Sequence, residues 1–140
     1  VAVLDVELPN VSTATGSRTL VPLSVFGVSN KNPFPSEQRK TPVYYTYTWQ
    51  HDDEVTLHLP AGYKVEGVPT GVVSGGGAIG FTTNFAAKDD TVTLKRQLFV
   101  NTILVDQKNY SIIRRFFSAV NTADQDALVL RKAAATKGTE

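Results

Sequence analysis

Glu54-Val-Thr-Leu-His-Leu-Pro-Ala-Gly-Tyr-Lys-Val-Glu-Gly-Val-Pro69 is the stretch of this chain that decides the fold class. Its first part alternates apolar and polar side chains, which is the period of a half-buried strand. Pro60-Ala-Gly62 then interrupts the run, because proline fixes φ and removes a donor while glycine can adopt a positive φ. The alternation resumes at Tyr63 and stops at Gly67. The stretch therefore predicts a strand, a tight turn and a second strand.

Short segments of β pattern lie on both sides of this unit. We expect further strands at residues 1–8, 19–26, 43–49, 79–85, 91–104 and 128–130. Polar, glycine or proline residues predict loops or turns between them, at residues 12–17, 30–36, 50–53, 73–78 and 88–90. Within the strand at 91–104, the apolar face changes sides near Arg96, which indicates a bulge or bend there.

One amphipathic helix is predicted late in the chain, over about residues 107–121. Its apolar stripe recurs at helical spacing, and Arg114 and Arg115 fall on the opposite, solvent side. Asp106 precedes the stripe and is the expected N-cap, since its carboxylate can accept backbone N–H groups. The stripe consists of Tyr110, Ile113, Phe116 or Phe117, and Val120.

These elements predict a mainly β fold. Several short strands with regular turns are typical of an antiparallel β-sandwich of the Ig-like or Greek-key type, and the helix is expected to pack on it. We assign residues 1–132 to a single domain and residues 133–140 to a flexible tail.

Composition excludes several functions. The net charge of +1 over 140 residues argues against nucleic-acid binding, and no apolar run is long enough to insert into a membrane. With no cysteine, the chain has no thiol nucleophile and no thiolate metal site. Since no methionine is present, even at position 1, we expect a longer or processed polypeptide that carries any targeting signal upstream.

The residues that could carry chemistry each have a structural alternative. Residues 51–54 place an imidazole beside three carboxylates, but successive turn residues point in different directions, so a solvated turn is favoured over a cation site. Residues 73–78 lack the lysine and the following helix of a phosphate loop, which leaves a hairpin loop. Tyr45, Tyr47 and Trp49 share one side of their strand and could stack on sugars or bases, yet packing in the sandwich core is favoured.

A set of motifs in this chain resembles one bacterial domain family. The motifs are Asn32-Pro-Phe34, Arg39-Lys-Thr-Pro-Val43, Leu59-Pro-Ala-Gly-Tyr-Lys-Val-Glu66 with Pro69, Arg96, Tyr110-Ser-Ile-Ile-Arg-Arg-Phe-Phe117 and Val129-Leu-Arg-Lys132. Together they are similar to the uncharacterised domain at the C-terminus of large exported bacterial proteins, where it follows a transglutaminase-like, papain-type domain. The resemblance implies a terminal β-sandwich, periplasmic or on the cell surface. The family's catalytic cysteine, histidine and aspartate belong to the preceding domain, so none is carried over.

We therefore expect a non-enzymatic accessory domain without catalytic residues, metal or cofactor. Its partner would be the upstream domain of the same polypeptide or another protein, contacted through an exposed Phe34 with Arg39, Lys40 and Tyr44. The alternative is a module that binds a glycan or an extended peptide through the aromatic strand or a sheet edge. Arg39 and Arg96 are charges in strand-rich surroundings, and we expect them to need partners.

Overall fold

The computed structural model describes residues 11–25 and 31–133. Its strands are β1 (Thr13–Thr15), β2 (Arg18–Pro22), β3 (Val43–Tyr44), β4 (Trp49–His58), β5 (Tyr63–Gly67), β6 (Val73–Gly76), β7 (Ile79–Lys88), β8 (Thr91–Val100), β9 (Leu104–Val105) and β10 (Ala127–Lys132). A 3-10 turn, η1 (Gln107–Asn109), leads into the α-helix α1 (Tyr110–Asp124). The described part of the chain is mainly β and antiparallel with one α-helix near its end, as the sequence predicts.

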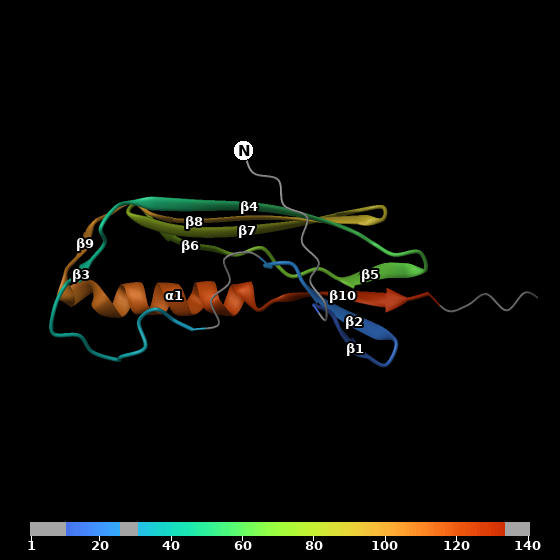
Figure 1. Ribbon diagram of the computed structural model, residues 1–140, viewed down its shortest axis with the longest axis horizontal. Helices are drawn as coiled ribbons and strands as arrows, with labels where there is room; N and C mark the ends of the chain where they lie inside the picture. Colours follow the sequence, from blue (N-terminus) through green and yellow to red (C-terminus); the bar gives the residue numbers. More distant parts are fainter. Residues whose placement is uncertain (1–10, 26–30, 134–140) are drawn as a thin grey trace, which may run out of the picture.

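A long four-stranded sheet in the order β4-β8-β7-β6 forms one layer of the molecule (Figure 1). The second layer is shared by α1 and by another four-stranded sheet in the order β1-β2-β10-β5. This arrangement confirms the sandwich of antiparallel sheets with a packed helix. In the long sheet β6, β7 and β8 follow one another as hairpins and β4 lies beside β8, which is a Greek-key order.

Both strands predicted within residues 54–69 are present in the structure. This stretch connects the two layers. β4 pairs with β8 in the long sheet, whereas β5 pairs with β10 in the other sheet. Between them, Gly62 adopts a φ of 83° in the turn after Pro60. The stretch is therefore the corner of the sandwich and not a paired hairpin.

β8 is the central strand of the long sheet, and it is regular throughout. It pairs with β4 on one side and with β7 on the other without a register shift, so the bulge expected near Arg96 is wrong. Every second residue from Val92 to Val100 is buried. The expected change of face does not occur, because the strand ends at Val100 and Arg96 itself occupies an inward position.

The segment at 43–49 is not one strand, in contrast to the sequence prediction. Val43 and Tyr44 pair with β9, and β4 begins only at Trp49. Residues 50–53, expected to be a turn, lie inside β4 because β8 supplies a partner for all ten of its residues. Tyr47 is 69% exposed and does not face the core, whereas Trp49 is partly buried and packs against it.

Two further loops predicted from composition contain strands. Residues 13–15 of the expected loop at 12–17 form β1, which pairs with β2. Residues 73–76 of the glycine-rich loop form β6, the edge strand beside β7. Backbone pairing with a neighbouring strand overrides the local turn composition in both cases. The strand predicted at 1–8 and residues 134–140 of the predicted tail lie outside the described residues.

The helix is confirmed and extends three residues beyond the predicted end, to Asp124. Its predicted stripe is buried, and so are both Phe116 and Phe117. Arg115 is exposed, while Arg114 is only partly so. The predicted cap is wrong: the Asp106 carboxylate makes no capping hydrogen bond, and its backbone oxygen instead accepts one from the Asn109 N–H at 2.9 Å.

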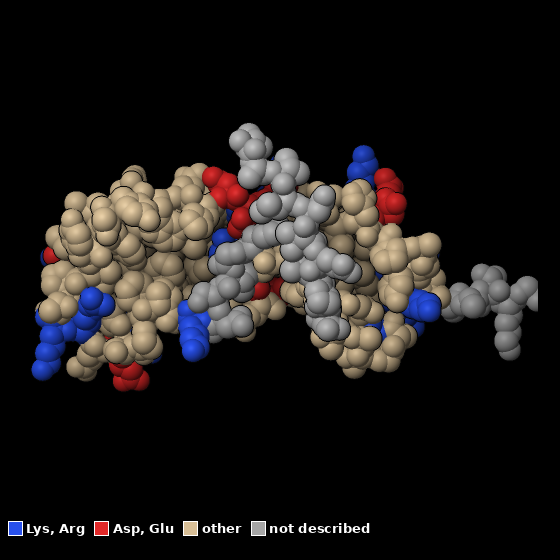
Figure 2. Space-filling view, in the orientation of Figure 1, with Lys and Arg blue, Asp and Glu red and all other residues tan. Residues whose placement is uncertain are grey.

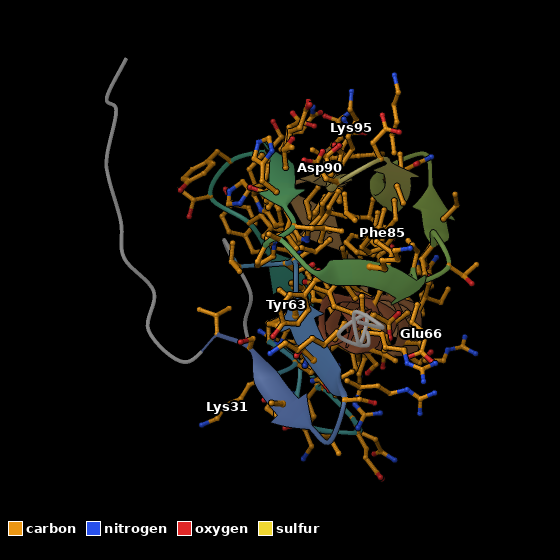
Figure 3. All side chains as sticks on the ribbon, turned by 90° about the vertical axis from the view of Figure 1, so that its right-hand side faces the viewer. Lys31, Tyr63, Glu66, Phe85, Asp90 and Lys95 are labelled. Carbon is orange, nitrogen blue, oxygen red and sulfur yellow. The ribbon has the colours of Figure 1, made fainter. Side chains whose placement is uncertain are left out.

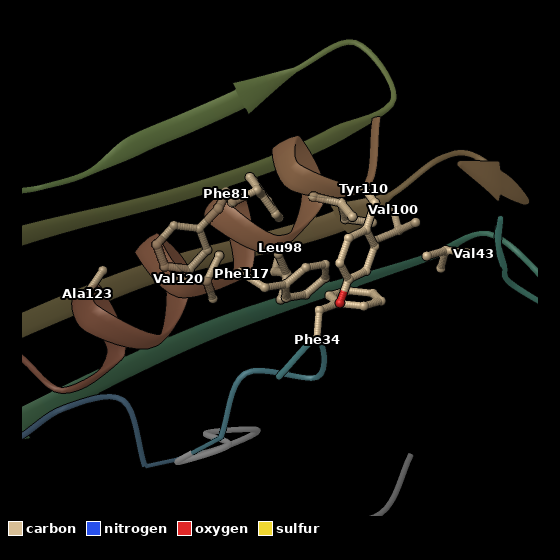
Figure 4. Packing of buried hydrophobic residues seen from close by; sticks show 11 residues of the cluster. Phe34, Val43, Phe81, Leu98, Val100, Tyr110, Phe117, Val120 and Ala123 are labelled. Carbon is tan, nitrogen blue, oxygen red and sulfur yellow. The ribbon is translucent and has the colours of Figure 1, made fainter. Parts of the chain in front are cut away.

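The layer between the sheets and the helix contains two hydrophobic cores. We call the one under α1 the helix-side core; it consists of Phe34, Val43, Phe81, Leu98, Val100, Tyr110, Ile113, Phe116, Phe117, Val120 and Ala123 (Figure 4). The sheet-side core, between the two large sheets, consists of Leu23, Val92, Leu94, Leu128 and Leu130. Figure 3 shows the molecule from the end that contains the sheet-side core. Tyr63 and Phe85 lie between the two sheets, and Lys95 lies on the solvent side.

Candidate functional site

Arg96 lies on the inner face of β8, between the residues that β8 gives to the two cores. Its Nε and Nη2 atoms donate to the two carboxylate oxygens of Asp124 on α1, at 2.7 and 2.8 Å. Its Nη1 donates to Oδ2 of Asp53 on β4 at 3.2 Å. The side chains of Arg96 and Asp124 are each 3% exposed. The three residues form a buried ion-pair network that ties the helix to the middle of the long sheet.

The charge on Arg96 is stabilised by these partners. Burial alone would lower the pKa of the Arg96 guanidinium, but the hydrogen bonds and charge of Asp124, with those of Asp53, outweigh it and raise the pKa above its ordinary value. The guanidinium also lies over the Phe81 ring, 5.2 Å from its centroid. The sequence prediction that Arg96 needs partners is thus confirmed.

Sequence reasoning missed the principal partner, Asp124. The signal that could have found it is the helical period: from Val120, four more residues lead to Asp124 on the same buried face. Ending the predicted helix at residue 121 removed Asp124 from that face. Asp53 was missed for a related reason, because it was placed in a turn and not on a strand.

A cleft of about 310 Å³ opens beside this network, which we call the Arg96 cleft. β4, β8, α1 and the loop at residues 31–33 form its walls. The Trp49 and His51 rings lie on the same side of β4 with their centroids 5.1 Å apart. The lining residues are Lys31, Asn32, Pro33, Trp49, His51, Arg96, Leu98, Phe117, Val120, Asn121 and Asp124.

A second surface lies where β3 and β9 meet the start of α1. Tyr44 and Leu104 are opposite each other in the β3–β9 pair and are 69% and 51% exposed. Ile103 and Ile112 are likewise half exposed. We call Tyr44, Ile103, Leu104 and Ile112 the end surface. Figure 2 shows that this end of the molecule is largely uncharged, with Lys and Arg side chains and a few Asp or Glu side chains along its margin.

The end surface is hollowed between β9 and α1. A depression of about 320 Å³ separates Leu104 from Ile112, and Ile79, Val105 and Ile113 contribute to its lining. Such a depression can accept an apolar side chain from another molecule, which is how anchor residues act in protein interfaces. An exposed apolar group of this kind marks a contact site more often than isolated exposed residues do.

Three of the four residues predicted for a partner surface are exposed. Tyr44 belongs to the end surface, and Arg39 and Lys40 are exposed in the loop before β3. Arg39 also lines a hollow with Lys108 and Ser111 at the start of the helix. Their role in binding a partner stays a prediction.

The expected exposure of Phe34 is wrong, because its side chain is only 7% exposed. Asn32 accepts a hydrogen bond from the Phe34 N–H at 2.8 Å and donates to the Arg114 carbonyl oxygen and the Ser118 hydroxyl. These bonds fix the loop against α1, and the Phe34 ring packs edge-on against Tyr110 at 5.9 Å (Figure 4). The polar loop composition gave no sign of this anchoring.

Two features are absent from the described residues, 11–25 and 31–133: a metal-ligand group and a membrane-spanning helix. In this part of the chain no three His, Asp or Glu side chains are grouped as a metal site. Over the same residues, no helix has the length and apolar character required to cross a bilayer.

The fold and its two surfaces define a β-sandwich module in which one helix replaces part of the second sheet. Residues 17–130 match the family described as "Domain of Unknown Function with solved-structure structure (DUF3858)", and the chain belongs to that family. The family assignment agrees with the unknown-function domain that the motifs indicated.

Among solved structures, the chain is similar to a crystal structure described as a "putative protease" from Parabacteroides distasonis ATCC 8503. The TM-score is 0.59 at 14% sequence identity, and the similarity covers 69% of this chain and 19% of that chain. At this identity the likeness is one of fold, and the chain spans about a fifth of that protein's length. No curated protein matches the chain.

Proposed function

We propose that this chain is a non-enzymatic accessory domain that packs through its end surface against another domain of its own polypeptide. The observation that carries the proposal is the group of four exposed apolar side chains, two of which, Leu104 and Ile112, line a depression that could receive an anchor residue. Arg39 and Lys40, exposed in the preceding loop, would form the polar margin of such an interface.

One observation and one physical argument support a partner within the same polypeptide. The similar solved chain is about five times longer than the part matched here, so this fold occurs inside a larger protein. A tethered partner also needs little intrinsic affinity, because a linker supplies an effective concentration in the millimolar range. A small end surface can then suffice for docking.

The more specific form of the proposal follows the resemblance of the motifs. In it, the domain closes the C-terminus of an exported, transglutaminase-like bacterial protein and lies in the periplasm or on the cell surface. Its partner is the transglutaminase-like domain, which supplies any catalytic activity. The isolated domain, which contains no cysteine, is then expected to lack hydrolase and transferase activity.

An NMR titration of the 140-residue chain with the separately expressed preceding domain tests this proposal. We expect weak binding, with the largest amide shifts at Tyr44, Ile103, Leu104 and Ile112. The charge-introducing variant Leu104→Glu should abolish these shifts. Val73→Glu is the matched control, because Val73 is 83% exposed on β6 and outside the end surface. Shifts that map to the second sheet, or an equal effect of the two variants, would contradict the proposal.

A further inference from the structure

β4 gives the long sheet a free edge. It is the outermost strand of the order β4-β8-β7-β6, and all ten of its residues pair with β8 on one side. In an antiparallel pair, opposite residues alternate between exchanging backbone hydrogen bonds and exchanging none. Every second residue of β4 therefore directs its N–H and C=O groups away from β8, toward the free side of the sheet.

Two backbone bonds just beyond the strand ends identify these residues. The Leu59 N–H donates to the Asp90 carbonyl oxygen at 2.7 Å, one step past the last β4–β8 pair, so the odd-numbered residues of β4 bond to β8. On the other side of β8, the Asn101 N–H donates to the Ala78 carbonyl oxygen at 2.6 Å. That bond assigns the odd-numbered residues of β8 to β7 and the even-numbered ones to β4, in agreement with the first. The free-side residues of β4 are Gln50, Asp52, Glu54, Thr56 and His58.

The backbone groups of these free-side residues have no partner among residues 11–25 and 31–133. In this part of the chain, no backbone hydrogen bond joins them to a loop or to another strand. Their side chains lie on the outer face of the sheet and are all exposed. An edge of this kind is a template to which an extended segment of another chain can add as a further strand.

The outer face of this edge is acidic. Within the described residues, the Asp52 carboxylate accepts hydrogen bonds from the neutral Gln50 and Gln97 amides, both at 2.7 Å, and forms no ion pair. The bonds from Gln50 and Gln97 lower the pKa of the Asp52 carboxyl, which keeps it charged at neutral pH. Glu54 is 3.6 Å from the Lys95 ammonium, and both side chains are exposed, so this pair is weak. Figure 2 shows acidic side chains gathered over the middle of β4.

These charges decide which occupant fits. Lysine or arginine opposite a carboxylate stabilises a strand pair, whereas like charges opposite each other destabilise it. A second copy of β4, paired about its centre, would place carboxylates against carboxylates. Residues 1–8 of the chain have a strand pattern, but they include Asp5 and Glu7 and no basic residue. The acidic edge therefore favours a basic segment over both of these.

The inner face of β4 adds an apolar requirement. Trp49, Val55 and Leu57 point toward the cores but are only partly buried. A strand added beside β4 would place every second side chain next to them, because successive side chains of a strand point to opposite faces. A matching segment therefore alternates apolar with polar residues and carries lysine or arginine in the polar series.

We propose that the free edge of β4 binds an extended basic segment of another protein, which adds to the long sheet as an additional strand. Its backbone pairs with the free-side residues. Its basic side chains lie beside Asp52 and Glu54, and its apolar side chains lie beside Trp49, Val55 and Leu57. The site is separate from the end surface and does not depend on the docking proposal.

Hydrogen exchange of the whole chain, followed by NMR, is the first test. The free-side amides of β4 should exchange rapidly, whereas the β4 amides bonded to β8 should exchange slowly. Slow exchange of both sets would show that the edge is already occupied, and it would overturn the proposal.

A random peptide library displayed on phage supplies the probe for binding. We expect the recovered peptides to alternate apolar and polar residues and to contain lysine or arginine. Added to the whole chain as synthetic peptides, they should slow the exchange of the free-side amides. Failure to recover such a peptide, or effects that map to another surface, would overturn the proposal.

Variants locate the binding on this edge. Thr56→Pro removes an N–H that points to the free side and leaves the bonds to β8 in place, which is a position where edge strands tolerate proline. It should abolish binding of the basic peptide. Asp52→Lys should weaken that binding about fivefold and strengthen the binding of a version with glutamate in place of lysine. Glu37→Lys, the matched charge reversal in the exposed loop before β3, should change neither.

Melting curves show whether each variant is folded. If Asp52→Lys binds the basic peptide as tightly as the unaltered chain, the assignment to this edge is wrong, whether or not Thr56→Pro folds. A folded Thr56→Pro that binds normally would contradict it equally.

Discussion

The two hydrophobic cores under the long sheet differ in their residue composition. The helix-side core is rich in aromatic side chains, five of which are buried there, and it is closed by a helix and a loop. The buried residues of the sheet-side core are all aliphatic, and they are closed by a second sheet. A helix is a narrow cylinder on a wide sheet, so large rings and loops must fill its flanks. The cleft and the depression described above both adjoin this half.

The buried ion-pair network lies where the two cores meet. Asp124 ends the helix that covers one core, and β10, which covers the other, begins three residues later. Arg96 occupies the central strand shared by both. One polar contact therefore joins two differently packed halves of the molecule.

The largest effect is expected from breaking this network. Asp124→Ala leaves the Arg96 charge buried without its principal partner, and we expect a loss of about 3–5 kcal/mol in the free energy of unfolding. Denaturation in urea, followed by fluorescence and circular dichroism, measures it. Glu66→Ala is the control, because its ion pair with Arg18 is exposed and should matter little. Unfolding in two separate steps in the unaltered protein would show that the halves are not coupled.

A glycine substitution affects the helix-side half alone. Gly75 has a φ of 82°, and a Cβ there would lie 2.4 Å from the Ile79 carbonyl oxygen and 2.9 Å from the Phe116 ring. We expect Gly75→Ala to cost roughly 2–4 kcal/mol, from the left-handed conformation and the overpacking together. Gly77→Ala is the matched control, because Gly77 also has a positive φ, 65°, but an added Cβ there would meet open space. We expect it to lower the free energy of unfolding by only about 1 kcal/mol. Equal melting temperatures for the two variants would contradict the contact between α1 and β6.

The smallest effect is one of pH, again confined to the helix-side half. Burial raises the pKa of Tyr45 from 10.0 to about 12. Because the folded state then holds this proton more tightly than the unfolded state, the stability is complete below pH 10 and declines as the pH rises toward 12. Tyrosinate absorbance should show a late transition, which is lost in Tyr45→Phe and kept in Tyr47→Phe. A late transition that persists in Tyr45→Phe would assign it to another side chain.

Much of the local structure could be predicted from the sequence. The strand, turn and strand of residues 54–69, the strand at 79–85 and the helix all follow from side-chain periodicity, which is a property of the segment itself. The need of Arg96 for a partner also follows from its chemistry, because a charge among strand residues is costly unless it is paired. These features require no knowledge of what lies across the core.

What the sequence did not determine depends on partners distant in the chain. Residues 50–53 extend as a strand only because β8 lies beside them, although their composition favours a turn. Phe34 is buried only because Asn32 binds the helix surface, more than 80 residues later. Asp124 becomes part of a site only when α1 packs against β8. Periodicity indicates which face of an element is apolar. Strand register, loop anchoring and charge pairing are decided by the tertiary structure, because they depend on contacts that only the folded chain brings together.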